Sequence, residues 1–284
     1  MTERLMKWKR FPGAPTKWSL PHVLGKYSKS HALQCEVGLS KAPKEEKRMV
    51  ICGGYPGLQN LEEFASSALK YKISTDLIFY QGIQQKCWML KMPSEDMMSF
   101  NKTIEGASQY LSKLPYQVIL AGYSLGSILL PEIIKRVPEK ISKILIINGF
   151  FHTKEFCAKE YSYKNRKGWD AWEKYFEDCV SHGKVPINGN PSEHFKEFVD
   201  LVKKTKNLEM VLKSCGKKVI IAHSPADKIV PFAYMEKYFP KNAQFIEIPG
   251  THEMLSIDSK TINPRAPEAI HCEERVIQRI YPYL

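Results

Sequence analysis

Short apolar runs alternate with amphipathic stretches along most of the chain. The runs are rich in β-branched residues and stop at glycine, proline or polar residues, which is typical of buried strands. The predicted strands cover residues 31–37, 48–54, 74–80, 116–122, 141–149, 217–224 and 243–249. Helical spacing of apolar residues predicts helices over 60–71, 94–113, from residue 124 onward, over 232–239 and from about residue 267. Strands separated by helices indicate an α/β fold with a mostly parallel central sheet and helices on both faces.

One long segment, residues 151–216, interrupts this alternation. Its apolar residues recur at helical spacing with no strand signal between them, as at Trp172 and Phe176 and again at Phe195 and Phe198. We therefore expect an all-helical insertion above the carboxyl ends of the strands. Because open α/β sheets hold their sites at that edge, this position predicts a lid.

The expected organisation is a single core with this one insertion. At 284 residues the chain is long for one small domain and short for two full ones. We expect a basic N-terminal segment over 1–30, an α/β core formed by 31–150 and 217–284, and the helical lid over 151–216.

The apolar content and the cysteines indicate a cytoplasmic protein. No run approaches the roughly 18 apolar residues that span a bilayer, and the start MTERLMKWKRF lacks an apolar signal core. We therefore expect a soluble chain with no transmembrane segment. Its seven cysteines are scattered and include no CxxC pair, which favours reduced thiols over a disulfide framework or a zinc site.

The positive charge is concentrated near the N-terminus. The chain carries a net charge of +12, and residues 1–50 contain 11 Lys or Arg against 4 Asp or Glu. Such a surplus is either a solvated basic face or a patch for an acidic partner such as acyl carrier protein, coenzyme A, anionic lipid or nucleic acid. Since nothing in the sequence matches a nucleic-acid-binding motif, no nucleic-acid partner is predicted.

A serine stands between two glycines where a predicted buried strand ends, in the stretch Gly122-Tyr123-Ser124-Leu125-Gly126. A serine hydroxyl is a poor nucleophile unless a base removes its proton and donors stabilise the oxyanion that forms. A tight strand-to-helix turn would expose the Ser124 hydroxyl and direct the Leu125 amide at the developing charge, and larger flanking residues would clash there. A serine that merely caps a helix is the alternative. The apolar strand before it and the helical stretch SILLPEIIKRV after it favour the nucleophile.

Two more side chains follow predicted strands in an order that suits this serine. Asp227 lies in IIAHSPADKIVP, and His252 lies in IEIPGTHEML just after a strand and a glycine turn. Each alone has an ordinary alternative, a capping carboxylate or a surface histidine. In the order Ser, Asp, His they predict a triad in which His252 takes the serine proton and Asp227 fixes its tautomer. His223 lies too close to Asp227 to reach Ser124 easily, and His152, at the start of the insertion, is a possible substrate contact.

These motifs resemble the α/β-hydrolase fold superfamily, in the branch of serine hydrolases that carry a helical lid after the sixth strand. The stretches VICGGYPG, AGYSLGS, VPEKISKILIING and HSPADKIVP followed by PGTHEML carry the resemblance, which reaches from about residue 30 to the C-terminus. It implies that VICGGYPG is the oxyanion loop, with Gly54 matching and the Tyr55 amide as the second donor beside that of Leu125. Gly53 replaces the usual histidine of this loop. The stretch YQGIQQ departs from the Asp-x-Arg-Gly-x-Gly-x-Ser turn of many relatives, which disfavours the epoxide hydrolase and dehalogenase branches.

The sequence therefore predicts a serine esterase that hydrolyses a carboxylic ester or thioester through an acyl-serine intermediate and needs no metal or organic cofactor. Gly54 and Tyr123 are expected next to the substrate. The basic surplus makes an acyl chain on acyl carrier protein or coenzyme A an alternative to a small-molecule ester. Peptidases with a proline preference, acyltransferases and lyases use the same triad. A catalytically silent binding protein with this fold is the alternative from a different class.

Overall fold

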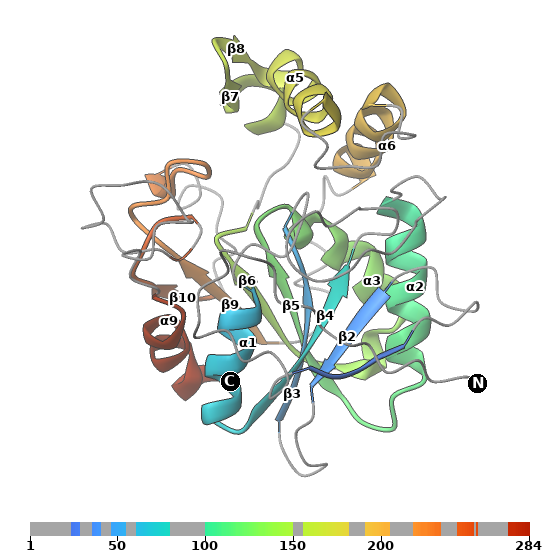
Figure 1. The fold of residues 1–284 in the computed structure, drawn as a ribbon, viewed down its shortest axis with the longest axis vertical. Coiled ribbons are helices and arrows are strands. Elements are labelled where there is room, and N and C mark those ends of the chain that lie inside the picture. Colours follow the sequence, from blue (N-terminus) through green and yellow to red (C-terminus); the bar gives the residue numbers. More distant parts are fainter. Residues whose placement is uncertain are drawn as a thin grey trace, which may run out of the picture.

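The computed structural model describes residues 24–28, 36–40, 47–54, 61–79, 100–149, 156–181, 191–204, 218–233, 243–252, 254 and 272–284. Their centre is an eight-stranded sheet in the order β1-β2-β4-β3-β5-β6-β9-β10 (Figure 1). The strands are β1 (Leu24–Ser28), β2 (Glu36–Ser40), β3 (Lys47–Cys52), β4 (Ile73–Phe79), β5 (Val118–Tyr123), β6 (Ile141–Ile147), β9 (Lys218–His223) and β10 (Gln244–Glu247). The neighbours from β4 to β10 pair in parallel, whereas β1 and β2 are antiparallel. The predicted α/β class and mostly parallel sheet are confirmed.

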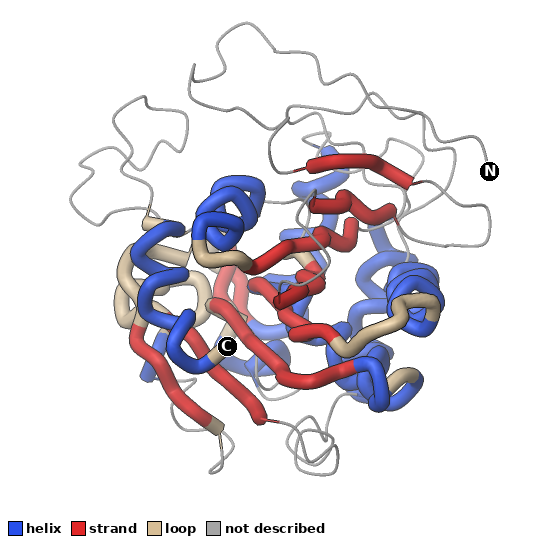
Figure 2. Tube along the Cα trace, turned by 90° about the horizontal axis from the view of Figure 1, so that it is seen from below, coloured by secondary structure: helices blue, strands red, loops and turns tan. Residues whose placement is uncertain are grey.

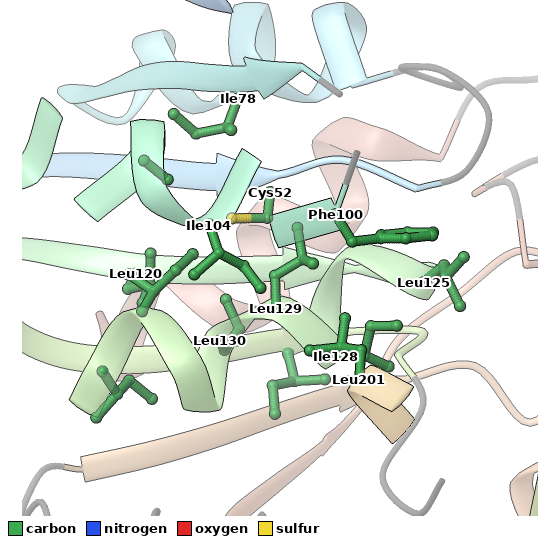
Figure 3. Packing of buried hydrophobic residues seen from close by; sticks show 14 of the residues in the cluster. Cys52, Ile78, Phe100, Ile104, Leu120, Leu125, Ile128, Leu129, Leu130 and Leu201 are labelled. Carbon is green, nitrogen blue, oxygen red and sulfur yellow. The ribbon is translucent and has the colours of Figure 1, made fainter. Parts of the chain in front are cut away.

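Helices cover both faces of this sheet (Figure 2). They are α1 (Leu61–Lys70), α2 (Phe100–Ser112), α3 (Leu130–Arg136) and α9 (Glu273–Ile280). Side chains of β3 alternate between two buried clusters: Met49 and Ile51 pack with α1 and α9, whereas Val50 and Cys52 pack with α2 and α3. This alternation is the period of two that a strand buried on both faces requires. Ile104 of α2 lies against the sheet beside Cys52 in Figure 3.

Several element boundaries differ from the sequence prediction. The sheet begins earlier than expected, because β1 falls within the segment 1–30 that was predicted to precede the core. The helix expected at Ser124 opens as a 3-10 helix, η2 (Ser124–Leu129), and becomes α-helical only in α3. The C-terminal helix α9 starts later than the predicted residue 267. Most of the helix predicted over 232–239 lies outside the described residues.

The insertion between β6 and β9 holds both helices and strands, so its prediction as all-helical is wrong. Its elements are a π-helical turn η4 (Phe156–Glu160), the hairpin strands β7 (Ser162–Tyr163) and β8 (Arg166–Lys167), and the helices α5 (Gly168–Ser181) and α6 (Pro191–Lys204). Lys164 and Asn165, between the two strands, have φ values of 46° and 64°, the left-handed pair that a tight hairpin turn needs. Strands of two residues are too short to show an alternating pattern, so periodicity could not predict them.

Figure 1 shows α5 and α6 beyond the carboxyl ends of the sheet strands, above the core. The carboxylate of Glu197 on α6 accepts hydrogen bonds from the backbone amides of Phe100 and Asn101, both at 3.0 Å, and so caps the start of α2. Leu201 packs near Ile128 of η2 in the same buried cluster as the sheet (Figure 3). The insertion thus shares one hydrophobic core with the sheet. In the described part of the chain, no helix is long and apolar enough to cross a membrane.

Candidate active site

Ser124 sits at the sharp turn where β5 gives way to η2. Its φ is 50°, in the left-handed region that residues with a side chain rarely adopt. Such a strained residue persists only where its surroundings hold it, and strain of this kind gathers at functional sites. The turn places the serine at the carboxyl end of a fully buried strand.

The two glycines around Ser124 are required by close packing. A Cβ atom on Gly126 would lie 2.2 Å from the carbonyl oxygen of Cys52 and 2.3 Å from that of Gly53. A Cβ atom on Gly122 would lie 2.5 Å from the Cα atom of Ser127. The predicted clash of larger side chains is therefore present. Since Gly126 touches the backbone at the end of β3, the loop that follows β3 starts beside the serine.

Ser124, His252 and Asp227 form one chain of hydrogen bonds. The Nε2 atom of His252 lies 2.8 Å from Oγ of Ser124, and its Nδ1 atom lies 2.7 Å from Oδ2 of Asp227. A carboxylate only accepts, so the Nδ1 proton is donated to Asp227, which leaves Nε2 free to accept from the serine hydroxyl. All three residues are buried, with exposed fractions of 6% for Ser124, 5% for His252 and 3% for Asp227.

The carboxylate of Asp227 is fixed by its own turn. Its Oδ1 atom accepts hydrogen bonds from the backbone amides of Ile229 and Val230, both at 2.8 Å, which leaves Oδ2 directed at His252. His223 lies behind it: Nε2 donates to the carbonyl of Val230 at 2.8 Å and is 3.7 Å from Oδ2 of Asp227. Burial lowers the pKa of His223, although Asp227 and the Val230 carbonyl oppose the shift. This second histidine is therefore a neutral neighbour of the acid.

The loop that carries His252 is held by side chains from other strands. The carbonyl oxygen of His252 accepts a hydrogen bond from the hydroxyl of Tyr123 at 2.8 Å and another from Nδ2 of Asn148 at 3.0 Å. Ser224 donates from its hydroxyl to the carbonyl of Gly250. Sequence reasoning missed Asn148 and Ser224. The sequence signal that could have indicated them is a polar residue directly after a buried strand, Asn148 in IINGF and Ser224 in IAHSP.

The structure describes three of the remaining predicted site residues, Leu125, Gly54 and Tyr123. Leu125 follows the serine in η2 and is buried, and Gly54 is buried just after β3. Tyr55, the predicted second oxyanion donor, lies outside the described residues, as does His152. Tyr123 is completely buried, and its hydroxyl donates to the loop that carries His252; its predicted contact with substrate stays a prediction.

The described thiols do not offer an alternative nucleophile. Cys52, Cys157 and Cys272 are buried. Burial raises the pKa of Cys52 to about 12, so its thiol stays protonated near neutral pH. Across the described ranges, no group of three or more His, Cys, Asp and Glu side chains is placed to hold a metal ion.

No protein-family model matches the sequence, and no curated protein matches it either. Solved structures do match the whole architecture. A thermophilic esterase from Thermogutta terrifontis is 12% identical with a TM-score of 0.56, covering 88% of this chain and 93% of its own. An α/β-hydrolase enzyme from a sediment metagenome of the lagoon of Mar Chica, Morocco, is 15% identical with a TM-score of 0.53, covering 90% and 96%.

The thioesterase domain from the curacin biosynthetic pathway is 11% identical with a TM-score of 0.51 and covers 81% of this chain and 93% of its own. At these identities the likeness concerns the fold. The mostly parallel sheet and the helices on both faces agree with it. The protein has the α/β-hydrolase fold.

Proposed function

We propose that this protein is a serine hydrolase that cleaves a carboxylic ester or thioester through an acyl-serine intermediate. The observation that carries the proposal is the hydrogen-bonded chain from Ser124 through His252 to Asp227. A serine on strained backbone, a histidine of fixed tautomer and a buried acid behind it together meet the requirements of nucleophilic catalysis by serine.

In the first half-reaction, Nε2 of His252 takes the proton from Ser124 as Oγ attacks the carbonyl carbon of the substrate. Asp227 stabilises the imidazolium that forms. The tetrahedral intermediate collapses when His252 gives this proton to the leaving alcohol or thiol, and the acyl group stays on Ser124. In the second half-reaction, His252 activates water, which attacks the acyl-serine and releases the acid.

The oxyanion of the tetrahedral intermediate needs two donors. The Leu125 amide, next to the nucleophile at the start of η2, is the first donor in this proposal. The Tyr55 amide is the second, as the sequence resemblance implies. The close contact of Gly126 with the carbonyl groups of Cys52 and Gly53 supports this assignment, because it brings the start of that loop beside the serine.

We assign the role of a lid to the insertion, because α5 and α6 lie above the edge of the sheet that holds Ser124. Solved structures with this fold include one named an esterase and one named a thioesterase domain, which supports an acyl substrate in general terms. The net charge of +12 keeps coenzyme A and acyl carrier protein as second candidates for the carrier of the acyl group. Activity on a carrier-bound substrate should fall steeply with added salt, whereas activity on a neutral ester should not.

The test is covalent labelling of the nucleophile. Purified wild-type protein is incubated with a fluorophosphonate and its intact mass is measured, beside Ser124→Ala, His252→Ala and the control Ser112→Ala. Ser112 is exposed at the end of α2, so this control should label like the wild type. We expect one adduct on the wild type, none on Ser124→Ala and slow labelling of His252→Ala. A wild type that neither labels nor hydrolyses esters of any acyl length would favour the silent binding protein instead.

A further inference from the structure

The loop that carries His252 has few main-chain links to the sheet. The Ile248 amide donates to the His223 carbonyl at 3.1 Å. Beyond this point the described main-chain bonds run from the Met254 amide to the Thr251 carbonyl at 3.0 Å and from the Cys272 amide to the Met254 carbonyl at 2.9 Å, and neither reaches the sheet. The carbonyl oxygens of Gly250, Thr251 and His252 instead accept from side chains of other strands. The position of the histidine therefore depends on these side chains.

Asn148 makes several of these contacts at once. Its Oδ1 atom accepts from the Ser224 amide at 2.9 Å, while Nδ2 donates to the carbonyl groups of His252 at 3.0 Å and Thr251 at 3.3 Å. A side-chain amide suits these contacts because its oxygen accepts while its NH₂ group donates two hydrogen bonds, whereas a carboxylate would face the carbonyl oxygens with like partial charge. Asn148 is completely buried and has a φ of 43°, a left-handed conformation that asparagine tolerates better than most residues.

Tyr123 adds a second donor to the same carbonyl oxygen and precedes the nucleophile directly. Its hydroxyl donates to the His252 carbonyl at 2.8 Å, and its ring centroid lies 5.8 Å from that of the histidine. The contacts form a closed ring. It runs from Ser124 to Tyr123, through the hydroxyl to the backbone of His252, and back from Nε2 to Oγ of Ser124. Because of this ring, the distance between Oγ of Ser124 and Nε2 of His252 depends on the position of the Tyr123 hydroxyl.

We infer that Tyr123 and Asn148 are positioning residues that fix the distance between Nε2 of His252 and Oγ of Ser124 by clamping the His252 carbonyl. This inference rests on the proposed serine hydrolase function. Neither side chain has to touch the substrate for this role. Removing one donor leaves a buried carbonyl with fewer partners and frees the histidine loop to shift. A misplacement of about 1 Å can lower the rate of the chemical step by about 100-fold.

The test measures kcat and KM on a p-nitrophenyl ester for Tyr123→Phe, Asn148→Asp and the double variant. The matched control is Tyr116→Phe, which also removes one phenol oxygen, there hydrogen-bonded to Arg48. Tyr116 precedes β5, at the opposite end of that strand from Ser124. We expect kcat to fall about 10-fold in each single variant and about 100-fold in the double one, with KM within about twofold. In Tyr116→Phe, kcat should stay at the wild-type value although Tm falls.

A proton NMR measurement separates positioning from general stability. The proton that His252 shares with Asp227 should change its chemical shift or broaden in Tyr123→Phe and stay in place in Tyr116→Phe. If Tyr123→Phe lowers Tm as Tyr116→Phe does while kcat and this resonance remain those of the wild type, the clamp is wrong. If wild-type protein forms no Ser124 adduct with a fluorophosphonate, the proposed function fails first, and this inference falls with it. An adduct that forms on the variants at the wild-type rate overturns the clamp alone.

Discussion

Two polar networks among the described residues differ in their chemistry, and the proposed function uses one of them. The first links Arg48, Asp76, Tyr110 and Tyr116 across β3, β4, α2 and the segment that precedes β5. The second is the chain of Ser124, His252 and Asp227 at the carboxyl ends of the strands. Both contain a carboxylate with almost no exposed surface, so burial of a charged group does not tell them apart.

In the first network, a carboxylate is paired with an arginine and a tyrosine hydroxyl. Arg48 donates two hydrogen bonds to the carboxylate of Asp76, from Nε at 2.7 Å and from Nη2 at 2.9 Å. The hydroxyl of Tyr110 donates to the same carboxylate at 2.6 Å. Burial of the guanidinium opposes its charge, but Asp76 more than offsets this and raises the pKa of Arg48. Burial, followed by the charge of Asp76, raises the pKa of Tyr110. Opposite charges in direct contact are typical of a structural ion pair.

The second network ends on the Ser124 hydroxyl, which lies within hydrogen-bond distance of a possible proton acceptor, Nε2 of His252. Its histidine stands between an acid and a serine, and the serine occupies strained backbone. The comparison teaches that a histidine hydrogen-bonded to both an acid and a serine hydroxyl indicates a candidate reactive site, whereas a matched pair of opposite charges indicates a structural role.

The largest effect should follow from Asp227→Asn, which changes the chemistry of the second network with little change of shape. The new amide would donate to Nδ1 of His252 and force the proton onto Nε2, which then cannot accept from Ser124. We expect kcat to fall by about 10⁴-fold, measured with an ester substrate. Asp200→Asn on the exposed side of α6 is the control and should leave kcat unchanged. Near-normal activity of Asp227→Asn would contradict the role of the acid.

A second strong effect should come from Gly126→Ala, which disturbs the geometry of the serine turn and leaves every hydrogen-bonding side chain in place. The added methyl group would lie 2.2 Å from the Cys52 carbonyl, so the turn and the end of β3 must move apart. We expect a loss of activity of about 100-fold and of stability by about 1–3 kcal/mol. Ester kinetics and urea unfolding measure the two, and an alanine variant with full activity would show that the contact is dispensable.

A substitution in the first network should lower stability and leave activity unchanged. Asp76→Asn leaves the half-buried guanidinium of Arg48, whose side chain is 21% exposed, without its carboxylate. A fully buried pair broken in this way costs about 3–5 kcal/mol, and we expect about 2 kcal/mol here because Arg48 can still reach water. The activity of the folded variant should match the wild type. A drop in kcat with unchanged stability would make this network part of the site.

The smallest effect concerns His223 and the pH dependence of stability. Its pKa is lower in the folded than in the unfolded chain, chiefly through burial, with His252 acting in the same sense and Asp227 and the Val230 carbonyl against it. The unfolded chain therefore binds a proton that the folded chain does not. Stability should fall as pH drops below about 6.5, by at most about 1.4 kcal/mol per pH unit for this one group.

His223→Gln keeps a donor for the Val230 carbonyl and removes the titration. Urea unfolding of both proteins between pH 7.5 and 5.5 gives the difference between their free energies of unfolding. The gap between variant and wild type should close or reverse as the pH falls. A gap that does not change with pH would show that His223 titrates alike in both states.

Part of the fold and of the candidate site could be predicted from the sequence. β5 and the second half of β6, after Lys143, are continuous runs of buried residues, and burial on both faces imposes that pattern on any buried parallel strand. Ser124, Asp227 and His252 could be named because each closely follows such a strand within a recognisable local motif. Parallel strands all point the same way, so residues just past their carboxyl ends gather at one edge.

Other features depend on which distant residues meet, and local pattern says nothing about that. β1 joins the sheet by backbone pairing with β2, and the hairpin of β7 and β8 is set by two left-handed residues in its turn.

The sequence by itself determined the α/β class, the order of most elements and the three residues of the hydrogen-bonded chain. Only the tertiary structure decided that Tyr123 and Asn148 hold the carbonyl of His252 and that Asp76 is matched by Arg48. Hydrophobic periodicity encodes whether a side chain is buried, because burial depends on the repeat of the element alone. The hydrogen-bond partner of a buried polar group depends on how the strands are ordered and packed, and that order exists only in the folded chain.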